Sequence, residues 1–221
     1  MAYKVLNNVS VKDVTSSDLL SLKTDLLVIV INKNTKDKVV NQLAKDVSSH
    51  LKESGSSVLV PNAKSFNAKN VLLVKGFQDS DQIHKLISMY QSIAQKGNQL
   101  KAKDISIMPG TVYPKGKCEM WLIEMVAKTI ESNVYIFSET CNKTAKKPSV
   151  KKLNILVSSL TKSDLIKAKN AAKKGYAIGE GVNSAKYLGD LPANHCTPRI
   201  IEKKVKACLL YTSDAADDVE C

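Results

Sequence analysis

The alternation of apolar and polar residues predicts strands and helices in turn over the first 160 residues. Four nearly continuous apolar runs are typical of strands buried on both faces of a sheet; they lie at residues 25–31, 70–75, 105–108 and 153–157. Weaker patterns predict strands at residues 4–9, 58–60 and 134–137. Apolar residues at helical spacing predict three amphipathic helices, at residues 38–52, 80–97 and 118–130.

This alternation predicts an α/β fold, with a mixed, mostly parallel sheet and helices on both faces. Such a sheet supplies its own core, so residues 1–160 are expected to fold as a domain. A long helix is predicted to follow, with Leu165, Ala168, Ala172 and Tyr176 on its inner face. Glycine costs about 1 kcal/mol in a helix interior. The run 179–181 (GEG) therefore predicts either a bend or a neighbouring backbone that packs very close.

Residues 179–198 predict a helix that ends in a connection bracketed by two prolines. Gly189 is predicted to end the helix, because glycine adopts a positive φ without steric penalty. Pro192 cannot continue a helix and favours extended geometry at Leu191. Thr197 and Pro198 then predict the N-cap and the first position of another helix. The pattern is that of a helix–loop–helix joint between two units.

The joint resembles a segment of the leucyl (cytosol) aminopeptidases, A-[RK]-x-L-x-[ND]-x-P-x-N-x-x-[TN]-P, where their N-terminal domain meets the catalytic domain. Eight residues match it: Ala185, Lys186, Leu188, Asp190, Pro192, Asn194, Thr197 and Pro198. The resemblance is sharp over residues 179–198 and loose elsewhere, up to about residue 207. It implies a macro-domain-like α/β unit at 1–160, an interdomain helix at 161–190 and the start of the catalytic domain at 191–207.

The resemblance also implies a function for the complete protein. The family removes N-terminal amino acids, preferably leucine, from peptides, and two divalent ions, zinc or manganese, activate the attacking water. It is cytoplasmic and hexameric. Its metal ligands lie beyond the joint, some of them in an N-T-D-A-E-G-R segment that does not occur in this sequence. We therefore assign no catalytic, cofactor-binding or metal-binding residue here and expect this chain to be inactive and to bind no metal.

The last fourteen residues, 208–221 (CLLYTSDAADDVEC), differ in composition from the rest. They contain four acids and no lysine. The segment resembles translated sequencing-adapter read-through, and we expect it to be non-native, with the true sequence ending near Ala207. Asp214, Asp217 and Asp218 lack the supporting scaffold that metal ligation requires, so we predict no metal site there.

The net charge of +12 is concentrated in one stretch. Residues 142–175 hold ten lysines and one acid, a local net charge of +9, which leaves +3 for the rest. Such a block attracts phosphate non-specifically. However, the chain has 32 lysines and a single arginine, Arg199, and arginine is the residue suited to bidentate recognition of bases and phosphates. A solvated basic face is favoured, and a non-enzymatic α/β module with weak nucleic-acid contact stays open as the alternative.

A macro-like nucleotide binder that uses Asp25 is a further alternative. Asp25 heads a buried strand and Asn32 lies past its end, but glycine-rich phosphate loops are missing, so a strand-start role is favoured. Adjacent residues of an extended segment point in opposite directions, so His195 and Cys196 are not expected to share a site. His50 and His84 are expected at the surface.

Other classes of protein are disfavoured by composition. No apolar run approaches the roughly 18 residues of a membrane span, and the N-terminus has no apolar region of a secretory signal. No C-x-x-C pair occurs, so zinc knuckles and thioredoxin motifs are unsupported. The five cysteines are expected to be reduced, as in a cytosolic protein: Cys118, Cys141, Cys196, Cys208 and Cys221.

Overall fold

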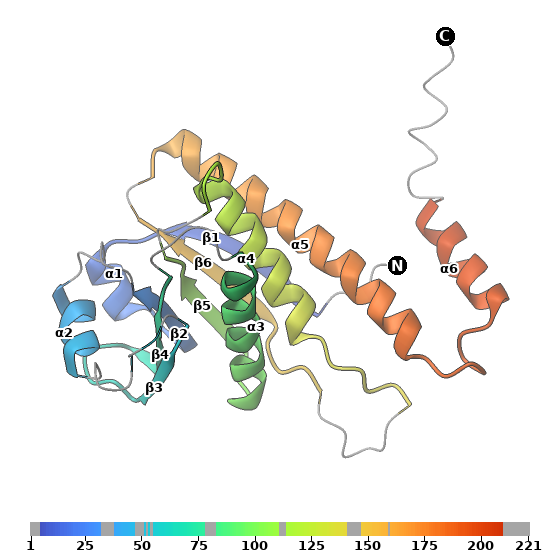
Figure 1. Cartoon of the computed structure of the whole chain (residues 1–221), viewed down its shortest axis with the longest axis horizontal. Helices are drawn as coiled ribbons and strands as arrows, with labels where there is room; N and C mark the ends of the chain where they lie inside the picture. Colours follow the sequence, from blue (N-terminus) through green and yellow to red (C-terminus); the bar gives the residue numbers. More distant parts are fainter. Residues whose placement is uncertain are drawn as a thin grey trace, which may run out of the picture.

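The computed structural model describes residues 5–31, 38–46, 51, 53, 55–77, 83–110, 114–140, 147–158 and 160–209. Six strands form one sheet: β1 (Asn8–Asp13), β2 (Thr24–Ile31), β3 (Ser57–Pro61), β4 (Ala68–Lys75), β5 (Asp104–Met108) and β6 (Lys152–Val157). In this described part of the chain, six helices accompany them: α1 (Ser16–Ser21), α2 (Lys38–Asp46), α3 (Ile83–Gln99), α4 (Glu119–Val134), α5 (Lys162–Asp190) and α6 (Pro198–Leu209). Figure 1 shows α5 running along the α/β body, with α6 beyond its end.

The sheet has the strand order β1-β6-β5-β2-β4-β3. Strands β1, β6, β5, β2 and β4 are parallel to one another, and β3 pairs antiparallel with β4. The predicted mixed, mostly parallel sheet is therefore confirmed. The four continuous apolar runs became β2, β4, β5 and β6, the inner strands of this order.

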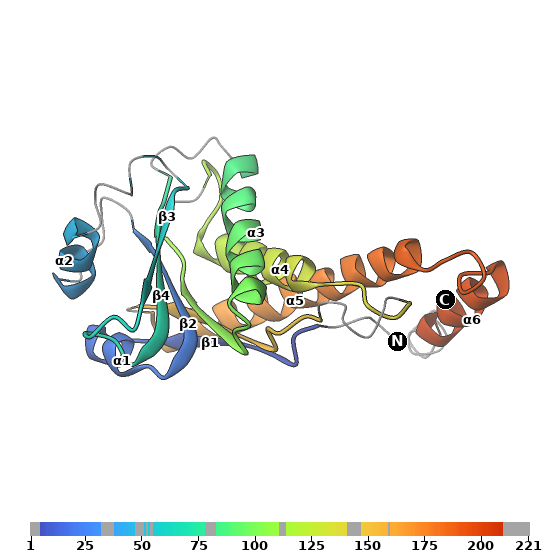
Figure 2. The same cartoon turned by 90° about the horizontal axis from the view of Figure 1, so that it is seen from below.

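Helices cover both faces of the sheet, as predicted (Figure 2). Because side chains alternate along a strand, Leu26 and Val28 of β2 enter the core under α3, α4 and α5. Leu27 and Ile29 of the same strand enter a smaller core on the side of α1 and α2. All four side chains are fully buried, which explains why β2 has no polar alternation.

Two of the weaker strand predictions were wrong. The first strand spans Asn8–Asp13 (β1) and not residues 4–9. Its pairing with β6 begins at Asn8–Lys152 and ends at Asp13–Val157. The backbone of Val5 and Leu6 instead binds a helix side chain described below. No strand forms at 134–137: Val134 ends α4, and Tyr135 caps it with φ −59° and ψ 133°.

Helix α1 was not predicted, although its start carries a clear local signal. The Thr15 side chain accepts a hydrogen bond from the Asp18 N–H, and the Asp18 side chain accepts one from the Thr15 N–H, a capping box. The predicted helix 38–52 is α2 as far as Asp46; residues 47–50 lie outside the described part of the chain. The predicted start of the next helix, near residue 80, also lies outside it.

The predicted helix–loop–helix over residues 179–198 is confirmed in outline and wrong in one detail. Helix α5 runs through Gly189 to Asp190, and Leu191 caps it with φ −70° and ψ 134°. Gly189 is therefore an ordinary helical residue, and the extended conformation expected before Pro192 ends the helix. The N–H groups of Ile200 and Ile201 bond to the Thr197 carbonyl, so α6 begins at Pro198 as predicted.

Candidate functional site

The long helix α5 lies side by side with α4, and the two run in the same direction. We call their line of contact the α4–α5 seam, made by Gly175, Gly179 and Asn183 of α5 and by Glu124 and Glu131 of α4. A Cβ atom at Gly175 would lie 2.1 Å from the Glu124 carbonyl oxygen, and one at Gly179 would lie 2.7 Å from the Glu131 Cβ. Only glycine permits this approach, so the close-packing interpretation of residues 179–181 is correct for Gly179.

Two further observations refine that interpretation. Helix α5 continues without interruption through residues 179–181, so the alternative of a bend is wrong. A Cβ at Gly181 would meet no atom of the described residues within 4 Å, so Gly181 is not part of the seam. Gly175, which approaches α4 most closely, did not stand out in the sequence because a single glycine has no pattern.

A fully buried carboxylate, Glu131, sits at the centre of the seam. It accepts hydrogen bonds from the backbone N–H groups of Val5 (2.8 Å) and Leu6 (3.0 Å). The Asn183 side-chain amide donates to it as well (2.9 Å) and also to the Glu131 backbone carbonyl (3.0 Å). One side chain thus joins the segment before β1, helix α4 and helix α5.

The electrostatics of Glu131 combine two opposing effects. Burial raises the pKa of its carboxyl above the usual range, and the hydrogen bonds from Val5, Leu6 and Asn183 act in the opposite direction. Glu180 of α5 raises the pKa further by charge repulsion. A carboxylate surrounded by N–H donors is already occupied as an acceptor, so it serves to hold helices rather than a cation.

Neighbouring contacts extend this attachment along α5. The Tyr176 hydroxyl donates to the Leu6 carbonyl oxygen at 2.7 Å, so both backbone polar groups of Leu6 are held. Burial, followed by Glu180, raises the pKa of the Tyr176 hydroxyl. Lys174 forms an ion pair with Glu124 at 3.1 Å. These contacts fix α5 both along and around its axis.

The C-terminal end of α5 is tied to the end of α4. The Lys186 ammonium donates to the Ser132 carbonyl oxygen at 2.5 Å, and the Tyr135 hydroxyl donates to the Asp190 carboxylate at 2.9 Å. Beyond this point α6 contacts α5 through Lys204, whose Nζ lies 4.0 Å from the centre of the Tyr187 ring.

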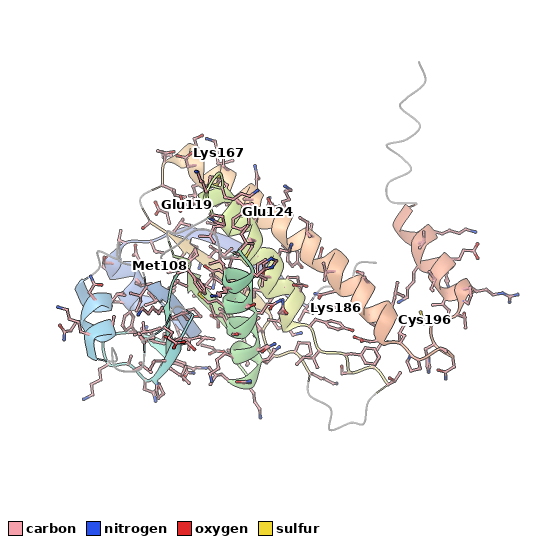
Figure 3. The ribbon with its side chains drawn as sticks, in the orientation of Figure 1. Met108, Glu119, Glu124, Lys167, Lys186 and Cys196 are labelled. Carbon is pink, nitrogen blue, oxygen red and sulfur yellow. The ribbon has the colours of Figure 1, made fainter. Side chains whose placement is uncertain are left out.

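The eight residues of the predicted joint motif follow one another along the chain rather than surrounding one point. They occupy the last turns of α5, the connection and the start of α6. Lys186 and Asp190 attach α5 to α4, as described above. Figure 3 shows Lys186 on α5 and Cys196 in the connection before α6. The sequence identified Lys186 and Asp190 as part of a motif. It did not identify their partners, Ser132 near the end of α4 and the residue that caps it, Tyr135, which are more than 50 residues away in the sequence.

Asp25 has a structural environment. Its carboxylate forms an ion pair with Lys69 at 2.5 Å and accepts a hydrogen bond from the Lys103 N–H at 2.8 Å. The Lys69 hydrogen bond is the main cause of a lowered pKa at Asp25. These contacts favour the strand-start role over nucleotide recognition. Asn32 lies outside the described residues.

The other candidate side chains that the structure describes form no cluster. His84 and His195 are exposed, Cys196 is half-buried, and His50 lies outside the described residues. Cys118 and Cys196 are free thiols. Within the described part of the chain, no group of three or more His, Cys, Asp or Glu side chains is placed to hold a metal ion. The described residues therefore do not fit the two ions that the resemblance implies.

The basic stretch is partly neutralised by neighbouring acids. Lys167 pairs with Asp164, and Lys174 with Glu124, both at 3.1 Å. Both lysines are exposed, so these ion pairs add little stability. No described contact favours the nucleic-acid alternative. Among the helices that the structure describes, none is long and apolar enough to cross a lipid bilayer.

Comparison with known proteins gives related sequences. No protein-family model matches the chain. It is 30% identical over 180 residues to a probable cytosol aminopeptidase of Vesicomyosocius okutanii subsp. Calyptogena okutanii, covering 80% of this chain and 35% of that protein. The probable cytosol aminopeptidase of Azotobacter vinelandii is 27% identical over 208 residues, covering 88% and 41%.

Solved structures share the fold. A tomato leucine aminopeptidase mutant superposes with a TM-score of 0.67 at 19% identity, over 93% of this chain and 42% of that one. The bottromycin maturation enzyme BotP in complex with Mn superposes with a TM-score of 0.60 at 14% identity, over 83% and 36%. The chain thus spans well under half the length of the relatives it matches. Sequence and fold agree, and the chain belongs to the cytosol aminopeptidase family, with the α/β fold of the N-terminal domain of leucine aminopeptidases.

Proposed function

We propose that this chain is the N-terminal part of a metal-dependent leucyl aminopeptidase that releases N-terminal amino acids from peptides. The observation that carries the proposal is the 30% identity over 180 residues to a probable cytosol aminopeptidase. In this proposal residues 1–160 form the N-terminal domain, residues 161–190 the interdomain helix and residues 191–207 the start of the catalytic domain. The complete protein is a cytoplasmic hexamer.

The role of this chain is to position the catalytic domain. Contact of Gly175 with the Glu124 backbone and of Gly179 with the Glu131 side chain leaves no space for α5 to slide or roll on α4. The bonds of Asn183 to Glu131 and of Lys186 to Ser132 continue this attachment for two further turns. Because α5 is one uninterrupted helix, its direction on leaving the body is set by this seam. This geometry supports a rigid connector between two domains.

The chemistry belongs to the rest of the protein. Two divalent ions, zinc or manganese, supply an activated water and polarise the scissile carbonyl when they are bound. The described residues offer no ligand set for them, and the N-T-D-A-E-G-R segment is not in the sequence. We therefore attribute peptide hydrolysis to the complete protein and not to this chain alone.

Sequencing of the gene past the codon for Ala207 tests the proposal. The expected result is a reading frame that continues into an N-T-D-A-E-G-R segment. The encoded longer polypeptide should release leucine from leucyl peptides when zinc or manganese is present, and the 221-residue chain should not. Leucine release by the purified chain would contradict the assignment of catalysis to the remainder. A stop codon directly after Cys221 in the gene would contradict the proposal as a whole.

A further inference from the structure

A chain of side-chain hydrogen bonds crosses four neighbouring strands of the sheet, β1, β6, β5 and β2 (Figure 1). The Ser10 hydroxyl donates to the Asn154 side-chain carbonyl at 2.9 Å, and the Asn154 NH2 group donates to the Ser106 hydroxyl at 3.0 Å. The Ser106 hydroxyl donates to the Thr24 hydroxyl at 3.0 Å, and the Thr24 hydroxyl donates to the Asp104 carboxylate. We call these five residues the polar row.

The Asp104 carboxylate fixes the direction of every bond in the polar row. An ionised carboxylate only accepts hydrogen bonds, so the Thr24 hydroxyl donates to it and accepts from Ser106. The Ser106 hydroxyl then accepts from the Asn154 NH2 group. Thr24 is 5% exposed and Ser106 is fully buried, and both hydroxyls have a donor and an acceptor. The buried part of the row is therefore fully hydrogen-bonded, as native buried polar groups usually are.

The strands that the row joins carry little other information about their register. Strands β2, β5 and β6 consist largely of apolar residues that are buried on both faces of the sheet. A slip of one residue exchanges the two faces of a strand, and in these strands apolar side chains would still meet an apolar core. Hydrophobic burial therefore stabilises several registers of such strands by similar amounts.

The polar row distinguishes the observed register from the others. Ser106 and Asn154 are direct partners in the ladder of β5 and β6, and Ser10 and Asn154 are direct partners in the ladder of β1 and β6. A slip of β6 by one residue would turn the Asn154 side chain to the other face, and the buried Ser106 would lose its donor. Burying polar groups without partners is unfavourable, so only the observed register satisfies the whole row.

We infer that the polar row selects the register of β1, β6, β5 and β2, and thereby sets the position of the α4–α5 seam. Leu6, which bonds to Glu131 and Tyr176, lies just before β1, and β6 leads into α5. A slip of either strand by one residue would displace the segment joined to it by about 3.3 Å, which is more than a hydrogen bond tolerates. The row decides between registers rather than adding stability, a role attested for buried polar groups in some proteins.

The triple variant Thr24→Val, Ser106→Ala and Asn154→Leu removes the row with little change of shape. Its hydroxyl and amide groups disappear together, so no fully buried group is left without a partner. Ser10 and Asp104, at the two ends, are half-buried, so water replaces the partners that they lose. We expect the variant to fold, with a midpoint of urea unfolding close to that of the wild type.

Methyl NMR spectra of the 221-residue chain report the register. Ile105 and Ile107 of β5 and Ile155 of β6 are fully buried, so each δ1-methyl signal depends on the neighbouring strand. We expect one signal from each residue in the wild type and at least two in the triple variant, from a minor register populated to about 10% or more. Thr129→Val is the control: it removes a buried hydroxyl of α4, whose bond to the Met125 sulfur is 3.5 Å long, and should keep one signal from each isoleucine.

Three outcomes overturn the inference. A single set of signals in the triple variant would mean that apolar packing alone sets the register. A triple variant that does not fold would mean that the row supplies stability and does not decide between registers. Additional signals in Thr129→Val as well would mean that the loss of any buried hydroxyl loosens the sheet.

Discussion

A single buried side chain, Glu131, decides how the long helix meets the body. Burying a carboxylate is unfavourable unless its oxygens are fully hydrogen-bonded, and here three N–H donors from two segments bind it. The donors come from Val5, Leu6 and Asn183, which are far from Glu131 in sequence. The cost of burying Glu131 is offset only when these three donors are in place, so this side chain specifies how α5 packs against α4.

Glu131→Gln tests this role with little change of shape. A glutamine keeps one acceptor oxygen and presents an NH2 group to the N–H of Leu6 or of Val5, so one buried donor loses its partner. We expect the free energy of unfolding to fall by about 1–3 kcal/mol at neutral pH, measured by urea unfolding followed by circular dichroism. Glu202→Gln on α6, whose carboxylate pairs with Lys206 in solvent, is the control and should have no measurable effect.

The difference in stability between the wild type and Glu131→Gln is also expected to depend on pH. Burial raises the folded-state pKa of Glu131 above the ordinary value of 4.5, so the folded protein binds this proton more tightly than the unfolded chain. The stability of the wild type relative to Glu131→Gln should then fall as the pH rises from about 4.5 through the folded pKa, and level off above it. A relative stability that rises with pH over this range would contradict the raised pKa.

At the scale of the helix, the glycines of α5 divide into two kinds. Gly175→Ala would place a methyl group 2.1 Å from the Glu124 carbonyl oxygen, so α5 would have to move off α4. We expect a loss of about 1–3 kcal/mol or more, as for overpacked cores. Gly181→Ala meets no atom within 4 Å and should stabilise the 221-residue chain by about 0.5–1 kcal/mol through helix propensity.

Thermal unfolding of the two variants side by side provides the measurement. The midpoint should fall for Gly175→Ala and rise for Gly181→Ala, relative to the wild type. Equal shifts of the same sign would mean that glycine acts in α5 only through helix propensity, and that the close approach to α4 is not what holds the helix.

The elements that the sequence predicts well are those whose signal is local. Strands β2, β4, β5 and β6 are buried on both faces, so each is a run of apolar residues by itself. Val5 and Leu6 look like part of a strand, but their N–H groups bind Glu131, more than 120 residues away. Glu131 has the sequence signature of a surface residue on an amphipathic helix. The seam is made by contacts between residues that are far apart in the sequence, which no local pattern predicts. Gly179 was its one residue that the sequence singled out as a place of close packing.

At the scale of the whole molecule, α5 and α6 differ in how firmly they are held. The middle of α5 is bonded to α4 and to the segment before β1, whereas α6 lies beyond the body (Figure 1) with Ile201 and Val205 in solvent. Hydrogen exchange of the 221-residue chain should show slow exchange for the amides of residues 175–183 and fast exchange for those of α6. Comparable protection in both helices would mean that α6 is packed as a part of the body.

Because the seam fixes the position of α5, the number of residues that follow it sets where the helix ends and in which direction the chain leaves it. Each residue of a helix adds about 1.5 Å and turns the chain by about 100°, and the contacts from Gly175 to Lys186 fix where that count begins. A residue inserted or deleted between Lys186 and Pro192 would leave every bond of the seam intact and yet redirect everything that follows. Between Lys186 and Pro192, natural variation is therefore expected to consist of substitutions more often than of insertions or deletions.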